Sequence, residues 1–276
     1  MNDKQLEKFA ANYEWWADRQ ARAQTVLTNK SIKETEKQLA KYYKSSMTKI
    51  FGQFEQTYHK LLLTIDEGRE PTPADLYKLD KYWQMQGQLR HELEKLGDKE
   101  IKLLSKEFNL HFFDVYYSFA LEGISAFNTI DTAAANAMIN SVWLADGKTF
   151  SQRVWGNIEN LVETLNDNLI NCVVTGKKTT ELTRLLQDRF NVSYNKADTL
   201  VKTEITHIQT QAAAQRYQDY GLTQYKFLAS PDDRTCGECA ELDGKVFYYS
   251  EMKPGVNAPP MHPRDRCSIV PVVNRK

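Results

Sequence analysis

The feature that most constrains the fold of this chain is a helical period of apolar residues that fills most of the sequence before Gly221. In the first long stretch, apolar residues recur at spacings of three, four and seven, which is the pattern of one buried helix face. These residues are Ile32, Leu39, Tyr43, Met47, Ile50, Phe54, Tyr58 and Leu61. Helices of this kind bury their apolar faces against one another, so the pattern predicts a mainly helical protein.

The helical pattern over residues 1–128 is interrupted once and then resumes. Asp66-Glu67-Gly68 and Pro71-Thr72-Pro73 form the interruption, and Thr72 is suited to cap a new helix whose first turn contains Pro73. The second helix is predicted over about 74–128, and its aromatic end is interpreted as core packing. Two long helices joined by a short break predict an antiparallel hairpin.

Residues 129–222 predict a helical body with three helices. The first runs from a capping Ser151 to about Val174 and is closed by Gly176. A short helix over about 179–190 and another over about 194–220, which ends before Gly221, follow it.

Residues 223–276 change character and predict a small β-rich module. Strands are expected over about 224–229, 245–249 and 268–273, with a hairpin-type Asp243-Gly244 before the second. A unit this small buries little apolar surface, so a metal ion would help it fold. The predicted fold class is therefore mainly α: a long helical hairpin and helical body, then a β-rich zinc-binding-type module.

The charge balance and the amino-terminal sequence limit the classes of function that are expected. Lysine plus arginine and aspartate plus glutamate number 36 each, so net charge supplies no global attraction to DNA or to an anionic membrane. No secretory signal and no membrane-spanning run is visible, which predicts a protein made in a cytoplasm. Thiols stay reduced there, and clustered cysteines then favour metal over disulfide.

Four metal-ligand residue types near the carboxyl end predict a zinc site. The pattern is C-x2-C-x22-H-x4-C, formed by Cys236, Cys239, His262 and Cys267. Three sulfurs and one imidazole form an ordinary tetrahedral structural zinc set. Two alternatives stay open: free buried thiols, and a redox pair, which would place C-x-x-C at a helix start after a strand. Cys172 is interpreted as an inert core thiol.

The sequence does not favour an enzyme. A zinc deaminase would need His-x-Glu before its paired cysteines, whereas His262 follows them here. No His-Glu-x-x-His, Gly-x-Ser-x-Gly or phosphate-binding loop is present. Glu204 and His207 share a helical face, and the interpretation we favour is a polar contact rather than an acid–base pair.

A DNA-binding role is the alternative function. Basic residues in the carboxyl-terminal part, beside aromatic residues able to stack on bases, suit a nucleic acid. The same charges, interrupted by acidic residues, also suit a solvated surface, which we favour. The candidate contacts to nucleic acid or to a partner are Lys202, Arg234, Arg264 and Arg266.

Several motifs together resemble a known family. They include Lys202-Thr203-Glu204, Asp233-Arg234-Thr235-Cys236-Gly237-Glu238-Cys239 and Pro259-Pro260-Met261-His262-Pro263. Together with Asp146-Gly147-Lys148 and Cys267, they are similar to tailed-phage minor head proteins, the head morphogenesis or Mu F-like proteins, over roughly 140–273. Many members have a cysteine where this chain has Asp265, which leaves Cys267 as the candidate fourth ligand.

The resemblance implies a function that the composition does not show. It implies a non-enzymatic virion protein inside the phage head, near the portal protein, that assists head assembly, DNA packaging or DNA ejection. Implied partners are the portal, the scaffold or major capsid protein, and packaged DNA, with no membrane and no small-molecule substrate. Some relatives carry a toxin or ADP-ribosyltransferase domain after the module, and we expect none here because the sequence ends soon after Cys267.

Overall fold

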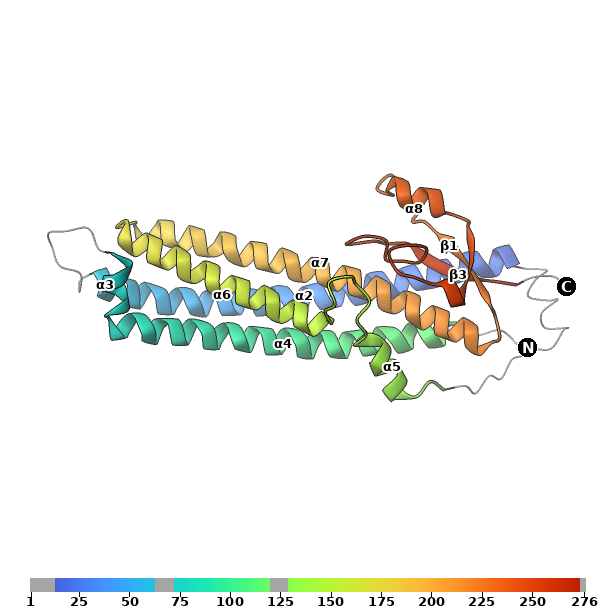
Figure 1. The fold of residues 1–276 in the computed structure, drawn as a ribbon, viewed down its shortest axis with the longest axis horizontal. Coiled ribbons are helices and arrows are strands. Elements are labelled where there is room, and N and C mark those ends of the chain that lie inside the picture. The colour runs from blue at the N-terminus through green and yellow to red at the C-terminus, as the bar shows by residue number, and fades with distance from the viewer. Residues whose placement is uncertain (1–12, 63–71, 120–128, 274–276) are drawn as a thin grey trace. The chain divides into compact units, whose positions relative to one another are not determined.

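The computed structural model describes residues 13–62, 72–119 and 129–273. The described elements are α2 (Tyr13–Leu62), α3 (Pro73–Tyr77), α4 (Asp80–Ser118), α5 (Thr132–Ile139), α6 (Phe150–Val174), α7 (Thr179–Asp219), β1 (Gln224–Leu228), α8 (Gly237–Leu242), β2 (Val246–Tyr248), the 3-10 turn η1 (Tyr249–Glu251) and β3 (Ser268–Val272) (Figure 1). The prediction of a mainly helical chain with a small carboxyl-terminal sheet is confirmed.

The chain forms two compact units that share helices. Unit 1 contains 1–35, 104–150 and 199–276, and unit 2 contains 36–103 and 151–198. Helices α2, α4 and α7 each contribute a segment to both units, so these units cut across the three consecutive regions predicted from the sequence. The boundaries of those regions, at 128 and 222, stay a prediction.

Unit 2 is a bundle of four antiparallel helical segments from α2, α4, α6 and α7. One buried layer joins all four: the Tyr43 hydroxyl donates to Glu100 at 3.0 Å, and the Asn157 amide donates to Tyr43 at 3.2 Å and to the Ser193 carbonyl at 3.0 Å. Contacts of α2 with α4 run in opposite chain directions, from Tyr43–Glu100 to Lys49–Glu92. The predicted antiparallel hairpin is therefore present in this unit.

A glycine in unit 2 makes room for an indole ring. A β-carbon built at Gly97 on α4 would lie 2.8 Å from the Trp155 ring on α6, closer than such atoms normally approach. We expect Gly97→Ala to destabilise the protein by about 1–3 kcal/mol, since overpacking outweighs the gain in helix propensity. Urea unfolding measures this change.

The matched test of that contact is a double variant. Trp155→Ala removes the ring, so adding Gly97→Ala to it restores the ordinary preference of a helix for alanine. Equal destabilisation by Gly97→Ala in the presence and absence of the Trp155 ring would show that the close approach is not the cause.

The helical part of unit 1 packs around a buried polar network. Gln24 donates to the Tyr217 hydroxyl at 2.8 Å, and Thr28 bonds to Gln209. The Thr28 hydroxyl also lies 3.4 Å from His111 Nε2. Burial lowers the pKa of His111 to about 4, so this imidazole is neutral at neutral pH.

The sheet of unit 1 has the strand order β2-β1-β3, and both pairings are antiparallel. Lys226 of β1 lies opposite Val246 of β2 on one side and Val270 of β3 on the other. Phe227 of β1 is fully buried and packs with Cys239 and Cys267, so the small core of the module contains the thiols themselves.

Two predicted helix ranges are wrong. The expected helices over 179–190 and 194–220 are one helix, α7, because residues 191–193 contain no glycine or proline and bury Ser193 in the bundle. The helix expected over 74–128 breaks after α3, with Lys78 and Leu79 between α3 and α4. Its end, like the interruption at 66–71, lies outside the described residues. Helix α8 was not predicted.

Helix α6 begins at Phe150, so Ser151 lies in its first turn and does not cap it as predicted. Two glycine predictions are confirmed. Gly176 has a positive φ of 61° two residues after the end of α6, as a helix-ending glycine requires, and Gly244 has a φ of 75° in the turn before β2. Among the described helices, none combines the length and apolar character that crossing a bilayer demands.

Candidate metal centre

The paired cysteines lie at the start of α8. Cys236 is the N-cap of this helix, and its Sγ accepts a hydrogen bond from the Cys239 main-chain N–H at 3.4 Å. The spacing C-x-x-C therefore places both sulfurs on the same turn, with Cys239 buried and Cys236 partly exposed. A redox pair would also have its C-x-x-C at a helix start after a strand. The position of Cys236 and Cys239 is therefore consistent with both the redox and the metal interpretation.

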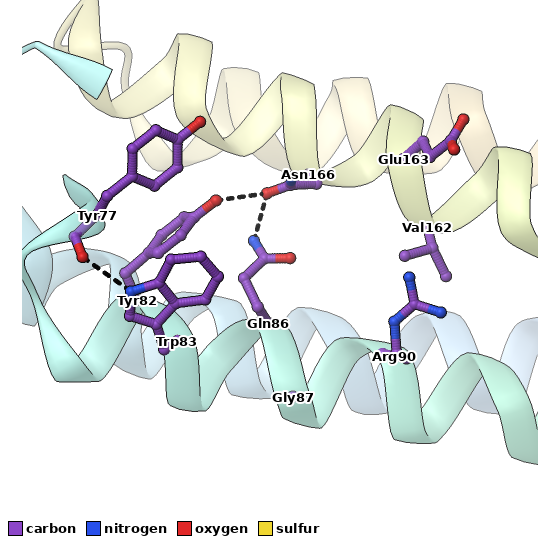
Figure 2. Close-up of a pocket in the computed structure, with 9 residues that line it drawn as sticks. All are labelled: Tyr77, Tyr82, Trp83, Gln86, Gly87, Arg90, Val162, Glu163 and Asn166. Atoms are coloured by element: carbon purple, nitrogen blue, oxygen red, sulfur yellow. Dashed lines mark hydrogen bonds between the residues drawn. The ribbon is translucent and has the colours of Figure 1, made fainter. Parts of the chain in front are cut away.

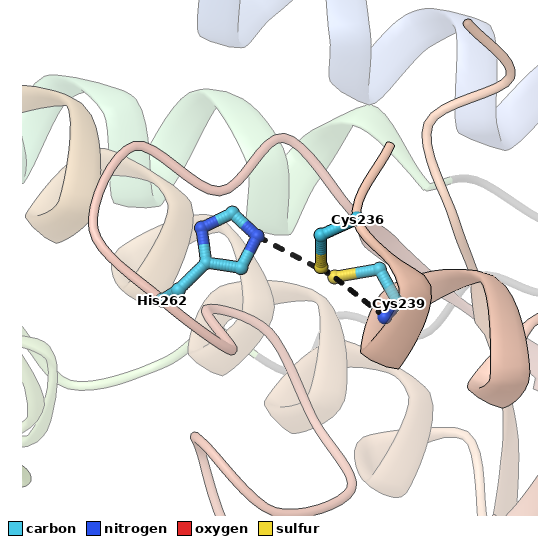
Figure 3. Close-up of side chains that lie close together, drawn as sticks. All are labelled: Cys236, Cys239 and His262. Atoms are coloured by element: carbon cyan, nitrogen blue, oxygen red, sulfur yellow. Dashed lines mark hydrogen bonds between the residues drawn. The ribbon is translucent and has the colours of Figure 1, made fainter. Parts of the chain in front are cut away.

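His262 approaches this pair from a distant loop. Its Nε2 lies 3.7 Å from Cys239 Sγ, and Figure 3 shows the ring edge directed at the two sulfurs. The other ring nitrogen, Nδ1, lies 3.0 Å from the Pro263 carbonyl oxygen. A carbonyl only accepts, so this contact assigns a proton to Nδ1, and in the neutral imidazole the Nε2 lone pair then faces the sulfurs.

Cys239 belongs to two groups of donor atoms. Cys236, Cys239 and His262 place theirs within 4.8 Å of one another, and so do Cys239, Asp265 and Cys267. The structure thus brings all four predicted ligands to one place around Cys239. It places Cys267 with Asp265 rather than in the first group, so the four-ligand set stays a prediction.

The thiol environments differ. The Cys239 amide lowers the pKa of Cys236, while burial raises the pKa of Cys239 to about 12 and also raises that of Cys267. The buried thiols of Cys239 and Cys267 are costly to ionise without a neighbouring cation, whereas the thiol of Cys236 ionises more easily. A divalent ion supplies that charge, so the cluster can hold a metal.

The loop that carries His262 is attached to α7. The Arg264 main-chain N–H donates to the Thr203 hydroxyl at 3.0 Å, and Arg264 Nε donates to the Thr199 hydroxyl at 2.9 Å. The Thr206 hydroxyl donates to the Asp265 carbonyl at 2.7 Å. Arg264 has a φ of 62°, unusual for a residue with a side chain, and these bonds hold it in that conformation.

The candidate nucleic-acid contacts have intramolecular partners. Arg266 bonds with both guanidinium nitrogens to Asp232, and Arg234 lies 3.5 Å from the same carboxylate. The side-chain bond to Arg266 lowers the pKa of Asp232. Arg264 bonds to Thr199 and so attaches the loop to α7. Lys202 likewise interacts with another part of the chain. Contact of these four residues with DNA or a partner stays a prediction.

Glu204 and His207 are both buried on α7, and each contacts Trp143, while a polar contact between the two stays a prediction. Trp143 Nε1 donates to the Glu204 carboxylate at 3.0 Å, and the Trp143 ring stacks on the His207 ring with centroids 4.2 Å apart. Both α7 side chains are 2% exposed. Trp143 thus uses its ring face and its N–H to cover this part of the helix.

Unit 2 has a groove of ≈ 800 Å³ between the α3–α4 region and α6 (Figure 2). Tyr77 and Trp83 present exposed rings on one side. Tyr82 and Gln86 both donate to Asn166, at 2.9 and 2.5 Å. These lining groups bond to one another, so the groove offers mainly aromatic surface and no catalytic constellation among its described residues.

Sequence reasoning missed Asp265 and the threonines of α7 as parts of the site's surroundings. Asp265 was treated only as a departure from the family pattern. The spacing of Thr199, Thr203 and Thr206 places them on one helix face, which is a signal that was available. Nothing in the sequence indicated which loop would lie on that face.

Comparison with known proteins supports the motif analysis. Residues 163–270 match the model of the family described as Phage Mu protein F like protein, and this segment contains every predicted metal ligand. The resemblance stated from the motifs is confirmed over this segment, which is less than half of the chain. The match covers the second half of α6, all of α7 and the Cys/His module that follows them.

One curated relative is similar over a shorter stretch. It is the NAD(+)–arginine ADP-ribosyltransferase EFV of Enterococcus faecalis, 28% identical over 109 residues, which cover 38% of this chain. The chain matches 22% of the length of that relative. No solved structure gives a significant match.

Proposed function

We propose that this chain, whose residues 163–270 match the Phage Mu protein F like family, is a non-enzymatic minor head component that binds the portal protein. In this role it assists head assembly, DNA packaging or DNA ejection from inside the virion. The observation that carries the proposal is the family match, which spans α7 and the Cys/His module attached to it.

The proposal includes a structural zinc ion in the module. The ligands are Cys236, Cys239, His262 and Cys267, and a thiolate-rich set with one imidazole is the kind that selects zinc. Zinc bonds of about 2.3 Å to sulfur and about 2.0 Å to nitrogen place tetrahedral sulfur and nitrogen ligands about 3.5 Å apart. The observed 3.7 Å between Cys239 Sγ and His262 Nε2 fits that separation.

A zinc ion would stabilise the module, whose apolar core is small. The buried residues of its central cluster are Phe227, Cys239 and Cys267, with a few partly buried neighbours around them. An ion bonded to α8 and to the 262–267 loop joins segments far apart in the sequence. The proposed role of the ion is therefore to hold the module in one conformation while the helices supply the surfaces for partners.

The test of portal binding is co-expression with the portal protein of the same phage, followed by size-exclusion chromatography. We expect the chain to elute with the portal assembly, and isolated heads to contain it. A matched control is the Cys172→Ala variant, which changes a buried thiol of unit 2 outside the proposed metal site. Persistent separate elution of the folded wild-type chain, and its absence from heads, would refute the proposal.

A further inference from the structure

The carboxylate of Asp265 lies among the metal-binding donors, yet both of its oxygens are used inside its own loop. Oδ2 accepts from the Met261 main-chain N–H at 2.7 Å, and Oδ1 accepts from the Cys267 main-chain N–H at 2.9 Å. The side chain is 3% exposed, so water does not compete effectively for these bonds. The carboxylate thus connects the main chain before His262 to the main chain at Cys267.

These bonds determine the shape of the segment that carries two proposed ligands. The Asp265 N–H also donates to the His262 carbonyl at 3.2 Å, which closes a turn between these residues. The turn places His262 near Cys236 and Cys239, while Cys267 packs against Cys239. One carboxylate therefore sets the separation of an imidazole and a thiol that approach the same sulfur.

The same turn is attached to a rigid helix. Thr203 and Thr206 of α7 bond to Arg264 and Asp265 respectively, as described above. Thr203 is itself held by the helix, because its hydroxyl donates to the Thr199 carbonyl at 2.7 Å. The single proton of the Thr206 hydroxyl is shared between the Asp265 carbonyl and the Lys202 carbonyl, which lies 3.1 Å away. The loop is thus fixed from inside by a carboxylate and from outside by threonine hydroxyls on α7.

We propose that Asp265 is a positioning residue of the metal centre, which holds His262 and Cys267 in place through main-chain hydrogen bonds and does not itself bind the ion. This inference rests on the metal site proposed above. It explains how the module tolerates an aspartate beside three cysteines. The carboxylate also places a buried negative charge near the cation, where it is stabilising without a bond.

Cobalt(II) is the probe that separates positioning from coordination. Its absorption bands report ligand type and geometry, and its thiolate charge-transfer intensity grows with the number of sulfur ligands. Wild type, Asp265→Asn and Asp265→Ala are titrated with Co²⁺ under reducing conditions, and zinc then displaces the cobalt. Asn keeps one acceptor oxygen but turns an NH₂ group toward the second N–H, so it preserves only part of the turn.

The expected result is a loss of affinity without a change of spectrum. Loss of a supporting bond around a metal ligand typically costs about 10–100-fold in affinity, and we expect that loss for Asp265→Asn and a larger one for Asp265→Ala. The spectrum per bound cobalt should equal that of wild type. Thr203→Val, which removes the acceptor for the Arg264 N–H, should weaken binding in the same way and tests the proposal independently if the Asp265 variants do not fold.

The control for charge is Asp233→Asn, on the exposed turn before Cys236, which should bind cobalt as wild type does. Shifted cobalt bands in Asp265→Asn would show that the carboxylate is a ligand and would overturn the proposal. So would unchanged affinity in both Asp265→Asn and Thr203→Val. If wild type binds neither cobalt nor zinc, the metal site itself fails, and this inference fails with it.

Discussion

The variant Cys239→Ser is expected to lose zinc and the ordered module. Cys239 belongs to both groups of donors and packs in the small core beside Phe227, so its removal affects coordination and packing together. Structural zinc contributes about 10–16 kcal/mol of apparent binding free energy, so losing one of four ligands should weaken binding by about 100- to 1,000-fold. Metal analysis of the purified protein, with hydrogen exchange over 224–272, measures both effects.

Chelation of the wild type should reproduce the result without a mutation. If the ion binds only the folded module, as proposed, its removal should lower the stability of unit 1 and increase exchange in β1, α8 and β3. The Cys172→Ala variant has the same number of remaining thiols as Cys239→Ser and should retain its zinc. Full exchange protection in the metal-free wild type would show that the module needs no ion.

The variant Glu100→Gln is expected to stabilise unit 2 at alkaline pH. Burial raises the pKa of Glu100 from 4.5 to about 7, and one carboxylate oxygen has no hydrogen-bond partner while the other accepts from Tyr43. The folded pKa lies above the unfolded one, so the stabilising contribution is complete below pH 4.5 and is lost as pH rises through 7. This rise in the pKa corresponds to about 3–4 kcal/mol at about 1.4 kcal/mol per pKa unit.

Urea unfolding at pH 5 and pH 8.5, followed by hydrogen exchange over 80–103, tests this prediction. Wild type should lose about 2–3 kcal/mol between the two values that Glu100→Gln does not lose. His111 and the metal site titrate in both proteins, so their effects cancel in the comparison. Glu94→Gln removes an exposed carboxylate from the same helix and should behave as wild type. Parallel pH profiles for wild type and Glu100→Gln would contradict the assignment.

Sequence alone determined the elements whose signals are local. Apolar residues at helical spacing predicted α2, α4, α6 and α7, because the face of a helix is set by residues three and four apart. Positive-φ positions at Gly176 and Gly244 were predictable for the same reason, since glycine tolerates that conformation best. The C-x-x-C spacing likewise predicted that Cys236 and Cys239 share one turn.

Tertiary structure decided the features that depend on which surfaces meet. The continuity of α7 through residues 191–193 follows from Ser193 packing in the bundle layer with Tyr43 and Asn157. The sequence does not distinguish Glu100 from an exposed glutamate on a helix, and only the packing of α4 in the bundle shows that its side chain is buried.

Part of the candidate site could likewise be predicted from the sequence, and part required the fold. Its donor types and their order were readable in the sequence, and they named Cys236, Cys239, His262 and Cys267. The role of Asp265 could not be predicted from the sequence. Whether a carboxylate binds a metal ion or accepts main-chain hydrogen bonds depends on which N–H groups lie near it, and the conformation of the loop determines that. The attachment of that loop to Thr203 and Thr206 required the fold, since contacts across some sixty residues leave no local periodicity.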